Sequence, residues 1–151
     1  MLNNIRKWQA MRFNQILVPV IGSPADEEAI QFACRLGKQD KCQVRAIYII
    51  TLKRDLSLDA EIKPEIQKAE EILNHIERIA AEQNCKIATD VLQAREVGPA
   101  IVNEAAQREV DLILMGFAYK RRFGEFSLGE AVPYVLKNAP CRVILYHLCP
   151  I

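Results

Sequence analysis

The sequence predicts an α/β fold, a three-layer open sandwich in which a five-stranded parallel sheet carries helices on both faces. The first observation is a regular alternation, since short apolar segments of strand length are separated by longer segments with helical spacing. The second is that the short segments are almost continuously apolar, which is typical of parallel strands buried on both faces. The third is the length of 151 residues, half of them apolar, which suits one globular domain.

The first strand is expected at residues 15–20, where a short apolar run is ended by a Gly-Ser-Pro turn. A helix should follow this turn, because Ser23 is a favourable N-cap residue and Pro24 suits the first helical position. Asp26 would complement the positive end of the helix dipole. Cys34 falls on the apolar face of the same helix, which favours a packing role over that of a reactive thiol.

The remaining elements continue the alternation of strand and helix. They are expected at residues 43–50 (strand), 64–84 (helix), 86–92 (strand), 98–108 (helix), 110–115 (strand), 128–138 (helix) and 142–148 (strand). In a parallel sheet of this kind, ligands bind beyond the carboxyl ends of the strands, where the strand order reverses. In this chain those ends are residues 20–23, 50–51, 93–96 and 115–129, so a ligand is expected to bind among them.

The composition argues against several classes of partner. Twenty Lys and Arg residues against nineteen Asp and Glu leave a formal net charge of +1, so no overall field attracts nucleic acid. The longest apolar runs are far too short to span a bilayer, and the N-terminus lacks the apolar segment of a signal peptide. The five cysteines show no C-x-x-C spacing and are expected to be reduced thiols. Together these features predict a cytoplasmic protein.

The chain divides into an N-terminal arm, residues 1–14, and a domain, residues 15–151. The arm mixes basic residues with apolar ones, Trp8 among them, which fits either a packing arm or linker or a segment that lies on a membrane surface. We favour the packing arm, because one short segment is weak support for a membrane anchor.

Motifs for catalysis are absent from the sequence. No common hydrolase, zinc-protease or NTPase signature occurs, and the chain has only two histidines, His75 and His147. His147 and Cys149 alternate onto one face of the last strand, but two ligands make a weak metal site. We therefore expect no catalytic residue and no bound metal.

Two stretches of the sequence resemble the universal stress protein family. The first is ILVPVIGS at residues 16–23, and the second runs through residues 111–143 with the segments DLILMG, LGEAV and VLKNAPCRV. The resemblance covers nearly all of residues 15–148 and implies an adenine nucleotide alpha hydrolase-like fold. It also implies a non-catalytic, dimeric domain with a regulatory role in the stress response.

The ATP-binding loop that this resemblance implies is degenerate. The nucleotide-binding branch of the family carries Gly-x-x-Gly, nine further residues, and then Gly followed by Ser or Thr. Gly116 and Gly129 match that pattern, whereas Tyr119 replaces the second glycine and Glu130 replaces the Ser or Thr. A carboxylate about 4 Å from a phosphate repels it by about 4 kcal/mol at an effective dielectric constant near 20. Ile21 also stands where the family commonly has an Asp, so weak or lost ATP binding is expected and no cofactor is assigned.

Retention of a low-affinity ATP or AMP site is an alternative function. By resemblance, the residues that would contact the nucleotide are Pro19, Ile21, Gly22, Ile47, Met115, Gly116, Tyr119, Lys120, Arg121, Arg122, Gly129, Glu130 and Ala131. In this reading the basic side chains of Lys120, Arg121 and Arg122 replace the lost loop contacts. A further alternative is a cytosolic regulatory domain associated with a membrane transporter, which only the N-terminal arm supports.

The last strand is the expected contact with a partner. The resemblance implies a homodimer that pairs through Arg142–Leu148, a segment without proline and with one formal charge. An exposed strand edge of this kind is a template for pairing with another chain. Contact with a different protein partner fits the same regulatory role.

Overall fold

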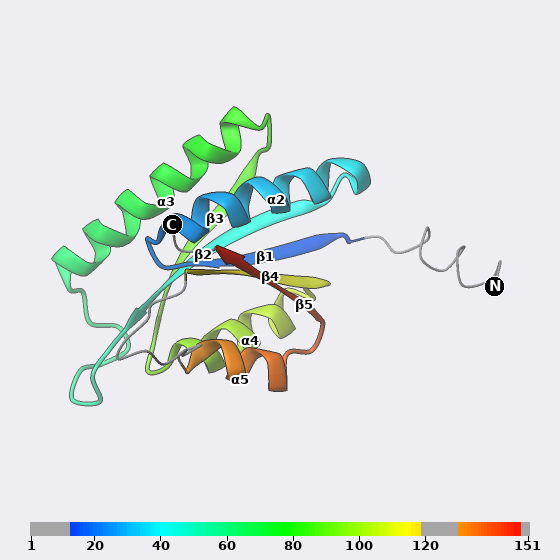
Figure 1. Ribbon diagram of the computed structural model, residues 1–151. Helices are drawn as coiled ribbons and strands as arrows, with labels where there is room; N and C mark the ends of the chain where they lie inside the picture. Colours follow the sequence, from blue (N-terminus) through cyan, green and yellow to red (C-terminus); the bar gives the residue numbers. More distant parts are fainter. Residues whose placement is uncertain (1–12, 119–129, 149–151) are drawn as a thin grey trace, which may run out of the picture.

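The computed structural model describes residues 13–118 and 130–148, which form one alternating series of strands and helices (Figure 1). In chain order the elements are β1 (Gln15–Val20), α2 (Pro24–Asp40), β2 (Gln43–Thr51), α3 (Lys63–Glu82), β3 (Ile87–Ala94), α4 (Val97–Gln107), β4 (Leu112–Ala118), α5 (Ala131–Asn138) and β5 (Arg142–Leu148). The predicted order of strands and helices is confirmed. Within the described residues, no helix has the length and apolar character needed to cross a membrane.

The strands form one parallel sheet in the order β3-β2-β1-β4-β5. Helices α2 and α3 cover one face and α4 and α5 cover the other, so the predicted three-layer sandwich is confirmed (Figure 1). The chain builds outward from β1 to β3 and then returns to β4, so the strand order reverses between β1 and β4. Strands β3 and β5 are the two edges of the sheet.

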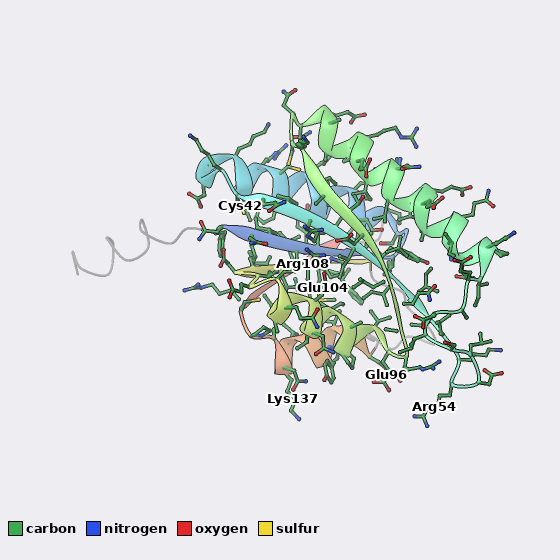
Figure 2. The ribbon with its side chains drawn as sticks, turned by 180° about the vertical axis from the view of Figure 1, so that it is seen from behind. Cys42, Arg54, Glu96, Glu104, Arg108 and Lys137 are labelled. Carbon is green, nitrogen blue, oxygen red and sulfur yellow. The ribbon has the colours of Figure 1, made fainter. Side chains whose placement is uncertain are left out.

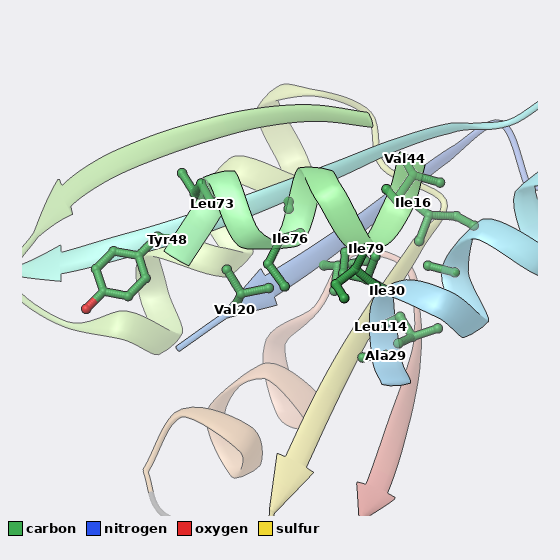
Figure 3. Packing of buried hydrophobic residues seen from close by; sticks show 14 of the residues in the cluster. Ile16, Val20, Ala29, Ile30, Val44, Tyr48, Leu73, Ile76, Ile79 and Leu114 are labelled. Carbon is green, nitrogen blue, oxygen red and sulfur yellow. The ribbon is translucent and has the colours of Figure 1, made fainter. Parts of the chain in front are cut away.

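The larger part of the core lies between the sheet and helices α2 and α3 (Figure 3). Alternate residues of each strand point to this face, as the two-residue period of a strand requires. They include Ile16, Val18, Val20, Val44, Ala46 and Leu114, which pack against Ile30 of α2 and Leu73, Ile76 and Ile79 of α3. Full burial of one such aliphatic side chain contributes about 1.5–3 kcal/mol. Cys34 lies fully buried in this layer, which confirms its packing role.

The opposite face of the sheet carries a smaller core. Leu17, Ile47, Ile113 and Met115 of the strands pack there against Ile101 and Ala105 of α4 and Val132 and Val135 of α5. Beside this layer, Glu104 of α4 and Arg108, the C-cap residue of this helix (Figure 2), form ion pairs that reach β3. Arg108 contacts both Glu104 and Asp90, and Asp90 also pairs with Arg45 of β2. This charged cluster ties α4 to the β2-β3 edge of the sheet.

Several element boundaries differ from those that the sequence predicts. Strand β3 continues to Ala94 because its partner β2 pairs with it as far as Thr51, and β4 continues to Ala118 because it pairs with β5 as far as Leu148. The residues before the described start of α5, 119–129, lie outside the description, as do 1–12 of the expected arm and 149–151. Of the arm, the backbone N–H of Phe13 donates to Asp40 Oδ2 (3.2 Å), so its last residues are held against the domain.

Candidate functional site

The carboxyl edge of the sheet brings together three of the predicted contact residues. Pro19 of β1 and Ile47 of β2 are direct register partners, and both are buried. Met115 of β4 is only 6% exposed and belongs to the same buried layer as Ile47, on the α4 and α5 face. An apolar floor of this kind suits the flat face of an aromatic ring such as a nucleobase.

The turn after β1 supplies two further predicted residues. The Ile21 side chain is 64% exposed, and it offers no hydrogen bond to a polar ligand where the resemblance implies an Asp. Gly22 has φ +88°, a backbone conformation that residues other than glycine rarely adopt. A Cβ atom at this position would also lie 2.9 Å from Ile72 Cδ1 of α3. The local fold thus requires glycine here whether or not a ligand binds.

Asp26 organises this turn, a role that the sequence analysis does not predict. Its side chain is 2% exposed, and its carboxylate accepts hydrogen bonds from the backbone N–H groups of Ile21 (3.1 Å), Gly22 (2.6 Å) and Ser23 (2.9 Å). Ser23 takes the predicted N-cap position of α2, with extended backbone angles. The N–H groups that end β1, which could otherwise bind an anion, are thus occupied by the protein's own carboxylate.

The surroundings of Asp26 act on the pKa of its carboxyl in opposing directions. Burial raises the pKa of the Asp26 carboxyl above its ordinary value, and the hydrogen bonds from the backbone N–H groups of Gly22, Ile21 and Ser23 offset part of that rise. The nearby charge of Glu27 raises the pKa further, so the pKa of Asp26 stays above its ordinary value. Asp26 thus acts as a structural acceptor within this turn.

Gly116 in β4 has a packing reason that is independent of any nucleotide. A Cβ atom at this position would lie 2.7 Å from the Ala25 carbonyl oxygen and 3.2 Å from Ala29 Cβ. Helix α2 therefore rests directly on the backbone of β4. The resemblance assigns the same glycine to the nucleotide loop, and the structure shows that the fold needs it for close packing.

Glu130 is the N-cap residue of α5, which begins at Ala131. The helix expected at residues 128–138 would instead have placed Glu130 within its first turn. Its side chain is exposed, and Ala131, the first helical residue, is half-buried. A carboxylate at this end of a helix is stabilised by the dipole. Because solvent surrounds the side chain, its repulsion of a phosphate about 4 Å away is closer to the value of about 1 kcal/mol in water than to about 4 kcal/mol at an effective dielectric constant near 20.

The other predicted residues of the loop, namely Tyr119, Lys120, Arg121, Arg122 and Gly129, lie outside the described residues. So does Cys149, the expected neighbour of His147. Within residues 13–118 and 130–148, no group of three or more His, Cys, Asp or Glu side chains is arranged to hold a metal ion.

A cleft that the sequence analysis does not predict lies on the α2 and α3 face of the sheet. It has a volume of about 390 Å³, and its walls include Gly22, Pro24, Glu71 and Ile72. His75 of α3 also lines it; its side chain is exposed, with Nε2 2.6 Å from Glu27 Oε1 of α2. Its charged walls are carboxylates, which repel phosphate. Sequence alone could place Glu71 and His75 one turn apart on a helix, but only the packing of α3 against α2 creates the cleft.

Comparisons with known proteins agree with this architecture. The model of the Universal stress protein family matches residues 12–147. Universal stress protein MJ0531 of Methanocaldococcus jannaschii is 29% identical over 150 residues, which covers 95% of this chain and 88% of the relative. The solved structure of hypothetical protein MJ0577 has a TM-score of 0.73 at 17% identity and covers 93% of this chain and 100% of that chain. The universal stress protein of Archaeoglobus fulgidus in complex with dAMP has a TM-score of 0.69 at 20% identity, over 89% of this chain and 98% of that chain.

Proposed function

This chain belongs to the universal stress protein family, and from that premise we propose that it is a non-catalytic, dimeric regulatory protein whose affinity for adenine nucleotides is weak or lost. A cytoplasmic location is part of the same proposal. Free cysteines such as Cys34, Cys85 and Cys141 are consistent with a reducing compartment.

The observation that carries the proposal is the state of the turn after β1. Ile21 presents an exposed apolar side chain where a polar contact to the nucleoside would be needed, and Asp26 occupies the backbone N–H groups beside it. Glu130 adds a carboxylate at the helix N-terminus that would face the phosphates. Each feature removes an attraction or adds a repulsion, so their effects on nucleotide affinity act in the same direction.

Support for a non-catalytic role comes from how the polar groups near this edge are used. The Asp26 carboxylate is buried and accepts three backbone hydrogen bonds, which leaves it unsuited to act as a general base. His75 is paired with Glu27 across the neighbouring cleft. Neither group is placed to transfer a proton at the apolar floor formed by Pro19, Ile47 and Met115.

Isothermal titration calorimetry with ATP, ADP and AMP at a fixed salt concentration tests the proposal. We expect each dissociation constant to exceed about 100 μM, which corresponds to a binding free energy weaker than about −5.5 kcal/mol. A low-micromolar constant for any of the three nucleotides, or nucleotide that remains bound through purification, would refute the loss of affinity.

Nucleotide binding is the second candidate function, because the apolar floor of the site is intact. Pro19 and Ile47 are register partners, Met115 packs in the same buried layer as Ile47, and a structure with the same fold was solved in complex with dAMP. In this candidate function, the basic side chains of Lys120, Arg121 and Arg122 supply the phosphate contacts. Tight ATP binding that is lost on substitution of these three residues by Ala would favour this second function over the first.

The proposed dimer pairs the β5 edges of two chains. The structure leaves Val143, Ile144, Leu145 and Tyr146 only half-buried, since the sheet ends at this strand. Tyr146 lies against Phe32 of α2, with ring centroids 5.9 Å apart, so its ring is already held in place before a partner binds. A second copy would cover these side chains and pair the β5 edges of the two chains. Association with a membrane transporter belongs to the same set of proposals, and its support, residues 1–14, lies almost wholly outside the described residues.

A further inference from the structure

Among the described residues, three cysteines gather on the α2 and α3 face at the amino end of the sheet, at the opposite end from the candidate nucleotide site. Cys34 lies in α2, Cys42 lies between α2 and β2, and Cys85 lies between α3 and β3. Figure 2 labels Cys42 at this end of the molecule. Cys34 is buried, whereas Cys42 and Cys85 are half-buried and pack against the same apolar cluster.

The strand register explains why two of these residues are neighbours. Val44 of β2 pairs with Ile87 of β3, and Cys42 and Cys85 each stand two residues before that pair. Because side chains alternate along a strand, both point toward the face that α2 covers. The register therefore brings to one place two cysteines that are 43 positions apart in the sequence.

Helix α2 places the third cysteine against this pair. Gly37 contacts the segment before β2 so closely that a Cβ atom there would be 3.5 Å from Cys42 Cβ. Cys34 precedes Gly37 by three residues and therefore lies on the same face of the helix. Cys34 is a buried member of the apolar cluster against which Cys85 packs, and Cys85 lies close enough to act on the Cys34 thiol. The Cys42 thiol instead donates to the Gln43 carbonyl oxygen (3.5 Å). Cys34 and Cys85 are thus the pair whose thiols interact.

The surroundings of the thiols assign them different roles. Burial and the hydrogen bond with Cys85 raise the pKa of the Cys34 thiol, so this group stays protonated and is shielded from solutes. Burial also raises the pKa of Cys42 to about 11. Cys85 is only partly buried and is therefore the more accessible member of this pair. A metal site is not the explanation, since no set of three ligands is arranged for one among the described residues.

We propose that Cys34 and Cys85 are an oxidative modification site, in which a peroxide converts the two contacting thiols into a disulfide between α2 and the start of β3. Cys85 loses its proton, and its sulfur attacks one peroxide oxygen. A sulfur–oxygen bond forms, the oxygen–oxygen bond breaks, and the leaving hydroxide takes up a proton to become water. The Cys34 sulfur then attacks the sulfenic sulfur of Cys85, and the hydroxyl group leaves as a second water with the Cys34 proton. One peroxide is reduced and two thiols are oxidised.

The test uses the full reduced chain, treated with hydrogen peroxide and then with iodoacetamide to block the remaining thiols. Peptide mass mapping should find a Cys34–Cys85 linked peptide about 2 Da lighter than the sum of its two reduced parts, and dithiothreitol should release it. Cys42 and Cys141 should carry the alkyl group. Absence of the linked peptide, or a link between Cys42 and Cys85 in its place, overturns the proposal.

Matched variants separate the proposed pair from its neighbours. Cys42→Ser and Cys141→Ser should keep the link, whereas Cys85→Ser should abolish it. Cys34→Ser should leave Cys85 as a sulfenic acid that dimedone labels, because the thiol that would attack it is gone. Loss of the Cys34–Cys85 link in the Cys42→Ser variant, or no dimedone label on Cys85 in the Cys34→Ser variant, contradicts the assignment even if the wild-type chain forms a disulfide.

Discussion

Replacement of Asp26 tests how the turn at the candidate site is held together. In Asp26→Ala the backbone N–H groups of Ile21, Gly22 and Ser23 lose their acceptor. Each lost hydrogen bond costs about 1 kcal/mol, and water can replace part of the loss at the exposed residues Ile21 and Gly22. We therefore expect the free energy of unfolding to fall by about 2–3 kcal/mol, which corresponds to a decrease in melting temperature of about 5–10 °C.

Asp26→Asn separates the acceptor from its charge. The amide oxygen can still accept the backbone bonds, and the neutral side chain avoids the desolvation cost that raises the pKa of the carboxyl. We expect Asp26→Asn to be less destabilising than Asp26→Ala by about 1 kcal/mol or more. Glu27→Ala is the control in the same helical turn. It removes a half-exposed pair with His75 and a negative charge that raises the pKa of Asp26, and it should cost less than about 1 kcal/mol.

The pH dependence gives the same experiment a second readout. The folded-state pKa of Asp26 is raised, so the folded protein binds this proton more tightly than the unfolded chain does. Its contribution to stability is therefore complete below about pH 4 and is lost as the pH rises through the folded-state pKa. Asp26→Asn should gain stability relative to the wild type over that interval in denaturant titrations. Equal losses for Asn and Ala, or no change with pH in their difference, would refute this reasoning.

Two further predictions concern packing and assembly. Gly116→Ala should destabilise the fold by about 1–3 kcal/mol, because the added methyl group meets the Ala25 backbone. Gly37→Ala should be nearly neutral, since the added Cβ would lie 3.3 Å from a Val44 side-chain atom and alanine favours the helix. Equal effects of the two substitutions in chemical unfolding would argue against the packing role of Gly116. In sedimentation at micromolar concentration, the wild type should have about twice the chain mass, and Leu145→Lys should shift it toward monomer. The control Leu136→Lys changes an exposed residue of α5 and should remain dimeric. A monomeric wild type would exclude the proposed edge. So would a Leu145→Lys variant that is folded by circular dichroism and still dimeric.

The sequence predicts the fold well because its main signals are local. Gln15–Val20 and Arg142–Leu148 are found with the expected bounds, since each is a short apolar run next to a turn signal or proline. The ends of β3 and β4 are not local in the same way. Ala94 and Ala118 belong to strands because they pair with Thr51 and Leu148 on the adjacent strands. No residue near them in the sequence indicates that pairing.

The candidate site is less predictable, because its key features depend on tertiary contacts. Asp26 reads as an ordinary carboxylate in the first turn of a helix. Its three N–H donors are only three to five residues away in the sequence, but its burial depends on the packing around the turn. Gly116 reads as a loop glycine, and only the approach of α2 reveals its packing role. The acidic cleft beside Glu27 and the contact between Cys34 and Cys85 arise in the same way, from segments that are distant in the sequence.

The central claim, that the altered residues at the carboxyl edge have weakened nucleotide binding, is tested most directly by parallel calorimetric titrations with ATP. One titration uses the wild-type chain, and the other uses a variant with Ile21→Asp, Tyr119→Gly and Glu130→Ser, which restores the pattern that the resemblance implies. We predict a dissociation constant above about 100 μM for the wild type and binding at least about tenfold tighter for the variant, a difference of about 1.4 kcal/mol. A wild-type constant in the low micromolar range, or equal constants for the two proteins, would contradict the account.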